Sequence, residues 1–117
     1  MNEFDIPIFK KIYELYKDFY LCLQNFPRQH RYSLGSKCDE LITEILASIV
    51  AASQLPKFGK LPHLEAASVK VNLLRINFRL AQEIKAMDTK RYLAFQATLD
   101  EVGKMLGGWI KMAKTNN

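Results

Sequence analysis

The sequence contains little of the material from which metal sites, disulfide frameworks and membrane spans are built. Only 2 of its 117 residues are cysteine and 2 are histidine. Cys22 and Cys38 have no metal-ligand spacing and are too few for a disulfide framework, so we expect them to behave as small hydrophobic side chains. No apolar run approaches the roughly 20 residues that a membrane-spanning helix needs. These absences largely exclude zinc modules, secreted mini-proteins and membrane proteins.

The first five residues, MNEFD, lack the basic start and apolar core of a signal peptide. We therefore expect a cytoplasmic protein that does not bind membranes. The composition, 49% hydrophobic and 25% charged, is that of an ordinary globular domain. At this length we expect a single domain that comprises residues 1–117.

Positive charge is in excess, and it lies in the second half of the sequence. The 17 basic and 12 acidic residues give a formal net charge of +5 and a pI near 9.3. Residues 1–55 contain six basic and seven acidic side chains, a net of −1, whereas residues 56–117 contain eleven and five, a net of +6. A surface that binds an anionic partner is therefore expected in the second half.

Apolar side chains recur at steps of three and four residues along four segments, which predicts four amphipathic helices. No window alternates between apolar and polar residues as a half-buried strand would. Together these features predict an all-α fold, an antiparallel up-down-up-down four-helix bundle. The main apolar rows run from Ile8 to Leu23, from Leu34 to Ala52, from Leu64 to Ala81 and from Tyr92 to Trp109.

Prolines and capping residues predict where the first two helices begin and end. Asp5 is a good N-cap, Pro7 suits a first helical turn, and the first helix should stop before Pro27. The second helix is expected to begin between Tyr32 and Ser36.

The third helix is expected to open near Pro62, because proline is favoured at the first helical position. Pro56 would then close the second helix, and Gly59 would lie in the loop together with Lys57 and Lys60. We expect the third helix to end near residues 86–87. Asp88 and Thr89 are both competent caps for the fourth helix.

The third predicted helix carries more apolar residues than one buried face requires. A wide buried face could accommodate them, but surplus apolar surface also marks protein–protein interfaces. We therefore expect a homo-oligomer or a tightly bound partner. The surplus residues are Leu73, Ile76, Leu80 and Ile84.

Catalytic and metal-binding motifs are missing from the sequence. His30 and His63 lie far apart, in predicted loops or at helix starts, where a lone histidine is usually solvated. There is no Glu-x-x-His pair for a di-iron site and no glycine-rich phosphate loop after a strand. We therefore expect no enzymatic activity, no cofactor and no metal. A small helical enzyme that holds a dicarboxylate with arginines is the alternative of a different class.

Basic side chains on the last two predicted helices are the stronger candidates for a binding site. Arg75 and Arg79 are one turn apart at the edge of the apolar row, which suits a contact to phosphate or carboxylate. Alternatively, they cover the core and pair with local acids such as Glu83. Lys104 and Lys111 form a second basic group, although lysines near a helix C-terminus also complement the helix dipole.

Gly107 and Gly108 interrupt the last predicted helix without interrupting its apolar period. Each glycine in a helix interior costs about 1 kcal/mol relative to alanine. Either another backbone or side chain approaches the pair closely, or the helix ends there.

Three stretches resemble the accessory variability determinant (Avd) proteins of diversity-generating retroelements. The most specific is LDEVGKMLGGWI at residues 99–110, which resembles the closing helix of that family. Residues 26–35 (FPRQHRYSLG) resemble the junction between the first and second helices of that family. Residues 73–80 (LLRINFRL) resemble its third helix, which carries two arginines. Bundle proteins encoded in ribosomal-RNA intervening sequences share the architecture, but residues 48–52 (SIVAA) lack their usual Asn-Ile-Ala-Glu-Gly-like motif.

The resemblance implies a function that periodicity alone does not indicate. Proteins of this family are four-helix bundles that assemble as closed pentamers, associate with a reverse transcriptase and bind nucleic acid. The complex makes mutagenised cDNA from a template-repeat RNA. The accessory protein itself has no catalytic role. The resemblance assigns reverse-transcriptase or nucleic-acid binding to Arg75 and Arg79, then to Lys104 and Lys111; the alternative is a ribosomal-RNA intervening-sequence-type bundle of unknown function.

Overall fold

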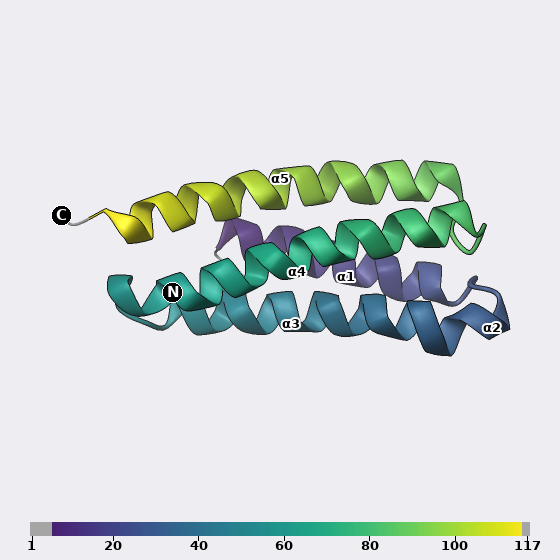
Figure 1. Cartoon of the computed structure of the whole chain (residues 1–117), viewed down its shortest axis with the longest axis horizontal. Helices are drawn as coiled ribbons and strands as arrows, with labels where there is room; N and C mark the ends of the chain where they lie inside the picture. Colours follow the sequence, from purple (N-terminus) through teal and green to yellow (C-terminus); the bar gives the residue numbers. More distant parts are fainter. Residues whose placement is uncertain (1–5, 116–117) are drawn as a thin grey trace.

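A computed structural model describes residues 6–115, and within this range the chain is helical with no strand. Four long helices lie side by side along an axis of 49 Å, and short connections at alternating ends join them (Figure 1). The prediction of an all-α, four-helix fold is confirmed. The helices are α1 (Pro7–Leu23), α3 (Ser36–Ser53), α4 (Lys57–Glu83) and α5 (Thr89–Lys114), and a short α2 (Arg28–His30) and π-helical η2 (Arg31–Gly35) lead into α3.

The first helix, α1, begins and ends where the prolines predict. Pro7 occupies the start of the helix, and α1 ends at Leu23, ahead of Pro27. Ile6 is the capping residue and makes no side-chain cap. The predicted cap, Asp5, lies outside the described residues.

The second long helix, α3, begins at Ser36, within the predicted window of Tyr32 to Ser36, but the short α2 and η2 precede it from Arg28 onward. Arg31 holds these short segments against the end of α1, because its Nη2 donates to the carbonyl oxygens of Gln24 (3.1 Å) and Phe26 (3.2 Å). These bonds satisfy carbonyls at the end of α1 and tie the new helix to it. At the other end of this turn, Gly35 is buried, and a Cβ there would collide with the side chain of Leu23.

The third long helix begins earlier than predicted. α4 starts at Lys57, so Gly59 lies in its first turn and Pro62 lies inside the helix. Pro56 already ends the preceding segment, with an extended ψ of 163°, and leaves no need for a second start at Pro62. Lys60 Nζ donates to the Ala52 carbonyl at 2.5 Å, which binds the first turns of α4 to the end of α3.

The end of α4 is a Schellman motif, which stops the helix at Glu83 instead of at residues 86–87. The amide of Ala86 donates to the Ala81 carbonyl at 2.8 Å, and that of Lys85 donates to the Gln82 carbonyl at 3.0 Å. Lys85 has a φ of 65°, the left-handed conformation that such a motif requires. The next helix starts as predicted, because Asp88 Oδ1 accepts a hydrogen bond from the Arg91 amide at 2.7 Å.

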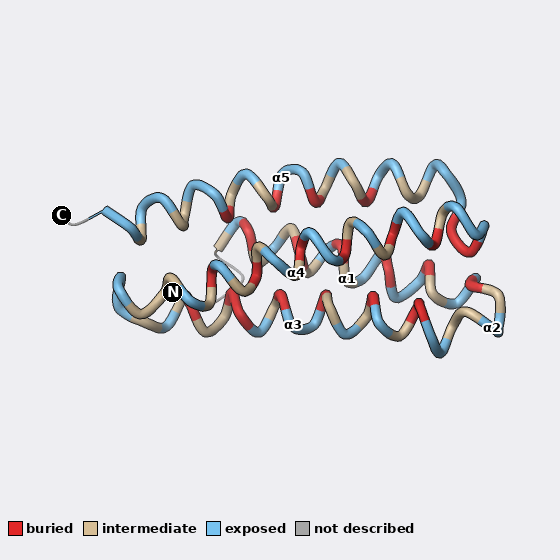
Figure 2. The backbone as a smooth tube through the Cα atoms, viewed as in Figure 1, coloured by how far each residue is buried: buried red, intermediate tan, exposed pale blue. Residues whose placement is uncertain are grey.

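The core lies along the inner faces of the four long helices (Figure 2). Its largest side chains are phenylalanines: Phe19 of α1 lies 5.4 Å from Phe78 of α4 and 6.2 Å from Phe95 of α5, measured between ring centroids. Phe78 and Phe95 are 5.1 Å apart. These three rings connect α1, α4 and α5 directly.

The two cysteines are buried and unpaired, as their positions on the apolar rows indicate. Burial raises the pKa of the Cys38 thiol to about 12 and raises that of Cys22, where the positive charge of Arg91 partly opposes the effect. Both side chains therefore act as small hydrophobic groups at neutral pH. None of the helices described is long and apolar enough to cross a membrane.

The left-handed conformation of Lys85 provides a test of the α4 end. Lys85→Gly should raise the free energy of unfolding by about 1 kcal/mol, because glycine adopts this conformation without a steric penalty. Lys85→Ala, which removes the same charge but retains the Cβ, should not. Chemical denaturation of both variants measures the difference; equal stabilities would contradict the assigned conformation.

Candidate functional site

Arg75, the first of the predicted site residues, connects α4 to α5. Its Nη1 lies 2.6 Å from Asp100 Oδ1 and 3.3 Å from Gln96 Oε1, and Gln96 Nε2 donates in return to the Arg75 carbonyl at 3.3 Å. The side chain is only 29% exposed. Arg75 therefore contributes to the packing of the two helices, in agreement with the alternative in which it covers the core.

Arg79 lies one turn further along α4 and has a different environment. Its side chain is 71% exposed, and its Nε lies 3.2 Å from Glu83 Oε2. This is the local ion pair that the alternative interpretation names. The two guanidinium groups each bind their own carboxylate, so the pair does not converge on one ligand in this structure.

Lys104 and Lys111 lie on α5, two turns apart and exposed. Between them Gly107 and Gly108 are also exposed, and apart from the adjacent residues and the backbone of α5 itself, no atom lies within 4 Å of where a Cβ on either would stand. Since α5 continues to Lys114, the alternative in which the helix ends at the glycines is wrong. Within residues 6–115 nothing packs against the pair, and neither lysine has an acidic partner.

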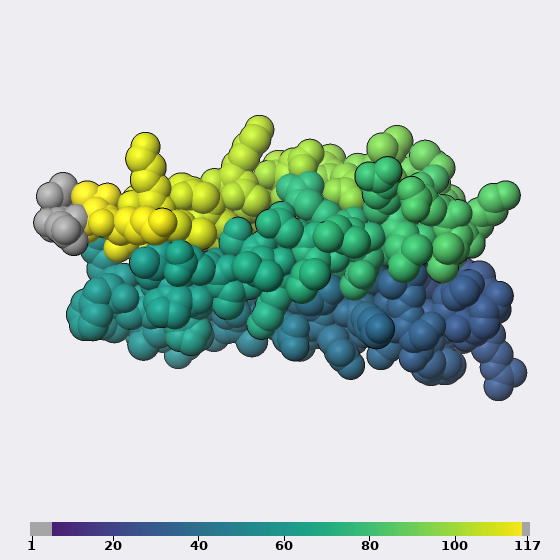
Figure 3. Space-filling view, viewed as in Figure 1, coloured from purple at the N-terminus to yellow at the C-terminus, as the bar shows by residue number. Residues whose placement is uncertain are grey.

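The surplus apolar residues of α4 are exposed, as an interface would require. Figure 3 shows α4 along the middle of the face turned to the viewer, with α5 above it and α3 below. Leu73 and Leu80 are each 45% exposed, and Ile76 is 63% exposed. The row is longer than predicted, because Val69 lies one turn before Leu73 and is 60% exposed. The exposed apolar row of α4 consists of Val69, Leu73, Ile76, Leu80 and Ile84.

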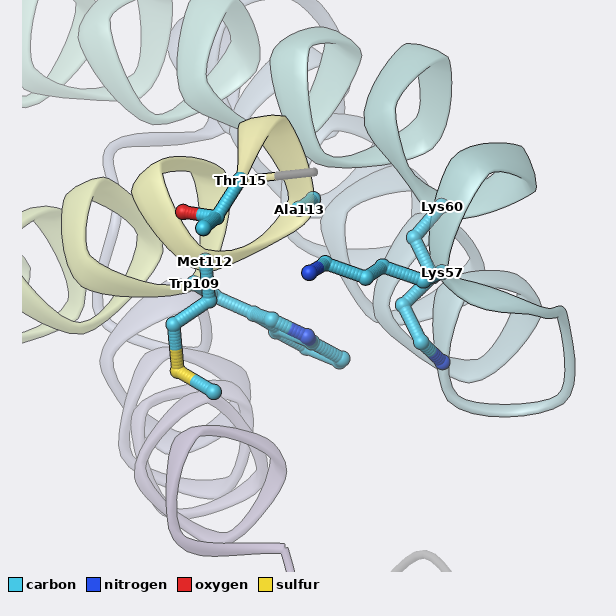
Figure 4. A pocket seen from close by; sticks show the side chains of 6 residues that line it. All are labelled: Lys57, Lys60, Trp109, Met112, Ala113 and Thr115. Atoms are coloured by element: carbon cyan, nitrogen blue, oxygen red, sulfur yellow. The ribbon is translucent and has the colours of Figure 1, made fainter. Parts of the chain in front are cut away.

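Two hollows flank Trp109 near the end of α5. One, of about 560 Å³, lies between the start of α1 and the last turns of α5, and Lys104 lines it with Met105 and Gly108. The other, of about 360 Å³, lies between the first turn of α4 and the end of α5 (Figure 4). Neither hollow is predictable from the sequence, because each draws its walls from the termini of two separate helices.

The model of the bAvd-like family matches residues 7–113. The chain belongs to the bAvd-like family. Membership confirms the resemblance seen in residues 26–35, 73–80 and 99–110, and it points to an accessory protein of a diversity-generating retroelement. A search of curated proteins gave no match.

As a bAvd-like protein, the chain carries its candidate functional groups on α4 and α5. The exposed apolar row occupies the outer face of α4, and Lys104 and Lys111 occupy the outer face of α5. Among residues 6–115, no three histidine, cysteine or acidic side chains are grouped as metal ligands. The surface therefore offers apolar contact and positive charge on neighbouring helices.

The different settings of the two arginines predict different contributions to stability. Arg75→Ala should lower the free energy of unfolding by about 1 kcal/mol, since it leaves Asp100 and Gln96 without their partner. Arg79→Ala should change it by less than about 0.5 kcal/mol, because that ion pair is exposed. Urea denaturation of the two variants tests this order, and a larger loss for Arg79→Ala would contradict it.

Proposed function

We propose that this bAvd-like protein is a non-catalytic accessory subunit of a diversity-generating retroelement. It forms a closed homo-oligomer of up-down-up-down bundles, a pentamer by family resemblance, and it binds the reverse transcriptase together with the template-repeat RNA and its cDNA. In this role it supports mutagenic cDNA synthesis. The family match over residues 7–113 carries the proposal.

The exposed apolar row of α4 supports self-association. Its members are spaced by three and four residues, so they form a continuous strip along one side of the helix. A strip of this kind would be buried by a neighbouring subunit, which recovers roughly 25 cal/mol for each Å² of apolar surface removed from water. The arrangement leaves the lysines of α5 free to meet a phosphate backbone.

The lysines of α5 support nucleic-acid binding. Lys104 and Lys111 are exposed and have no acidic partner within the described range, whereas Arg75 and Arg79 each neutralise a carboxylate. Lysines that have no ion pair within the protein can replace the counterions of a phosphate backbone without first giving up a carboxylate partner. Arg79 remains a candidate contact for the reverse transcriptase or RNA, because its pair with Glu83 is exposed and readily exchanged.

Self-association through α4 can be tested by light scattering. The wild-type chain should be a closed oligomer at micromolar concentration, and the double variant Leu73→Glu with Leu80→Glu should be a folded monomer, since buried carboxylates oppose assembly. Leu21→Glu is a matched control, because Leu21 is 62% exposed on α1. A monomeric wild type, or an oligomer that tolerates the double variant, would refute the assignment of the interface.

Nucleic-acid binding can be tested by measuring affinity for single-stranded RNA against salt concentration. Lys104→Ala with Lys111→Ala should weaken binding and flatten the logarithmic salt slope by about 1.4, the value for two lost phosphate contacts. Arg75→Ala with Arg79→Ala should weaken binding less. Lys10→Ala with Lys37→Ala removes the same charge from α1 and α3 and serves as the control; an equal effect would show that only net charge matters.

The retroelement role itself has a separate test. Co-purification with a reverse transcriptase encoded beside the gene, near a pair of template and variable repeats, is the expected result. A ribosomal-RNA gene around the coding sequence would instead favour the intervening-sequence type of bundle.

A further inference from the structure

The smaller hollow beside Trp109 combines positive charge with an aromatic wall. Lys57 and Lys60 line it from the first turn of α4, and Trp109 and Met112 line it from α5, with Ala113 and Thr115 beside them (Figure 4). Its volume of about 360 Å³ lies within the range of pockets that hold small organic groups. Both cationic and flat apolar surfaces are therefore available to one ligand.

Lys60 is fixed at the wall of this pocket. Its Nζ lies 5.7 Å from the centroid of the Trp109 ring, and it donates to the Ala52 carbonyl. A carbonyl is neutral, so this hydrogen bond orients the ammonium group without cancelling its charge. The pocket consequently has an ordered positive charge next to an indole, a cation–π arrangement that needs no ligand to form.

Further lysines surround the pocket, because the first turns of α4 and the last turns of α5 meet at one end of the bundle (Figure 1). Residues 57–64 and 102–115 contain five lysines and no aspartate or glutamate. These two segments therefore have a local excess of positive charge, and they would attract a polyanion over a distance set by the ionic strength. The five lysines are Lys57, Lys60, Lys104, Lys111 and Lys114.

We propose that the pocket binds one unpaired nucleotide of a single-stranded nucleic acid, with the base against Trp109 and Met112 and the adjacent phosphates near Lys57 and Lys60. This inference rests on the proposed function and adds to it a site and a preference for single strands. Stacking on an aromatic side chain within a basic groove is how proteins hold unpaired bases without reading sequence. A duplex could place its phosphates near the lysines but could not stack a base on Trp109, since its bases are already stacked on one another.

An acidic peptide fits the pocket less well. It would pair with the lysines but would leave the apolar wall of Trp109 and Met112 without a planar partner. A nucleotide uses both surfaces at once.

The protein contains a single tryptophan, so its intrinsic fluorescence reports on the two hollows beside Trp109, and loss of the signal in Lys57→Gln, whose side chain lines only the smaller hollow, assigns it to this pocket. Titration of the full-length protein with an eight-residue oligouridine should quench the Trp109 emission to saturation. A second titration, with a single-stranded oligothymidine of the same length, distinguishes RNA from cDNA as the bound species. A blunt duplex of equal length should bind by charge and quench far less.

Variants separate the pocket from general electrostatic binding, which fluorescence anisotropy of a labelled strand measures independently. Trp109→Leu should weaken single-strand binding by roughly tenfold, whereas Trp109→Phe should retain most of the affinity. Lys57→Gln should reduce the salt slope by about 0.7. Phe58→Leu is the matched aromatic control, because Phe58 is 84% exposed at the same end but does not line the pocket. Thermal melting confirms that each variant is folded.

The outcomes distinguish this inference from the proposed function. If a single strand binds without changing the Trp109 emission, and if Trp109→Leu does not weaken that binding, the pocket is not the nucleotide site. The proposed nucleic-acid binding would then remain intact. Equal quenching by duplex and single strand would overturn the preference for unpaired bases. Quenching by a poly-glutamate peptide but by no oligonucleotide would overturn the inference in favour of an acidic protein partner. Absence of all oligonucleotide binding would contradict both the pocket and the nucleic-acid part of the proposed function.

Discussion

The contact among Phe19, Phe78 and Phe95 is the constraint on which the rest of the bundle depends. The three rings come from three different helices and lie within 6.2 Å of one another, between centroids. All three are near the end of the bundle that holds α2 and the α4–α5 connection, because Phe19 and Phe78 lie late in their helices and Phe95 lies early in α5. The bulkiest packing is therefore concentrated at one end.

Among the described residues, the opposite end is less completely filled, and this asymmetry places the candidate binding surfaces. α1 has 17 residues and begins at Pro7, whereas α5 has 26 and α4 has 27. At ~1.5 Å per residue, α5 is about 13 Å longer than α1, so its last turns extend beyond the start of α1. Trp109 consequently has hollows on both sides. Within residues 6–115, this end does not contain all four long helices, and it also holds the five lysines.

Residue periodicity predicted the buried faces well, but it could not predict contacts between distant segments. The core row of α4 from Leu64 to Ala81 is buried as its spacing indicates, and Asp88 caps α5. Pro62 was misleading, because its preference for a first turn is weak once Pro56 has already stopped the chain and Lys60 has bonded to Ala52. The partner of Arg75 was also hidden: Asp100 is 25 residues away, and only the packing of α5 on α4 brings it within 2.6 Å.

In the proposed function, separate surfaces for assembly and for nucleic-acid binding would resolve the difficulty that a net charge of +5 is small for a protein that binds a polyanion. The exposed apolar row lies on α4, while Lys104 and Lys111 lie on α5, so burial of the first leaves the second in solvent. In the proposed oligomer each subunit would present the same lysines to one strand. Affinity would then increase through effective concentration and through the sum of phosphate contacts over several subunits, without a large charge on any one of them. A modest charge on each chain also lowers the repulsion between subunits during assembly. In this proposal, self-association would be the step that converts a weakly basic bundle into an effective RNA-binding protein.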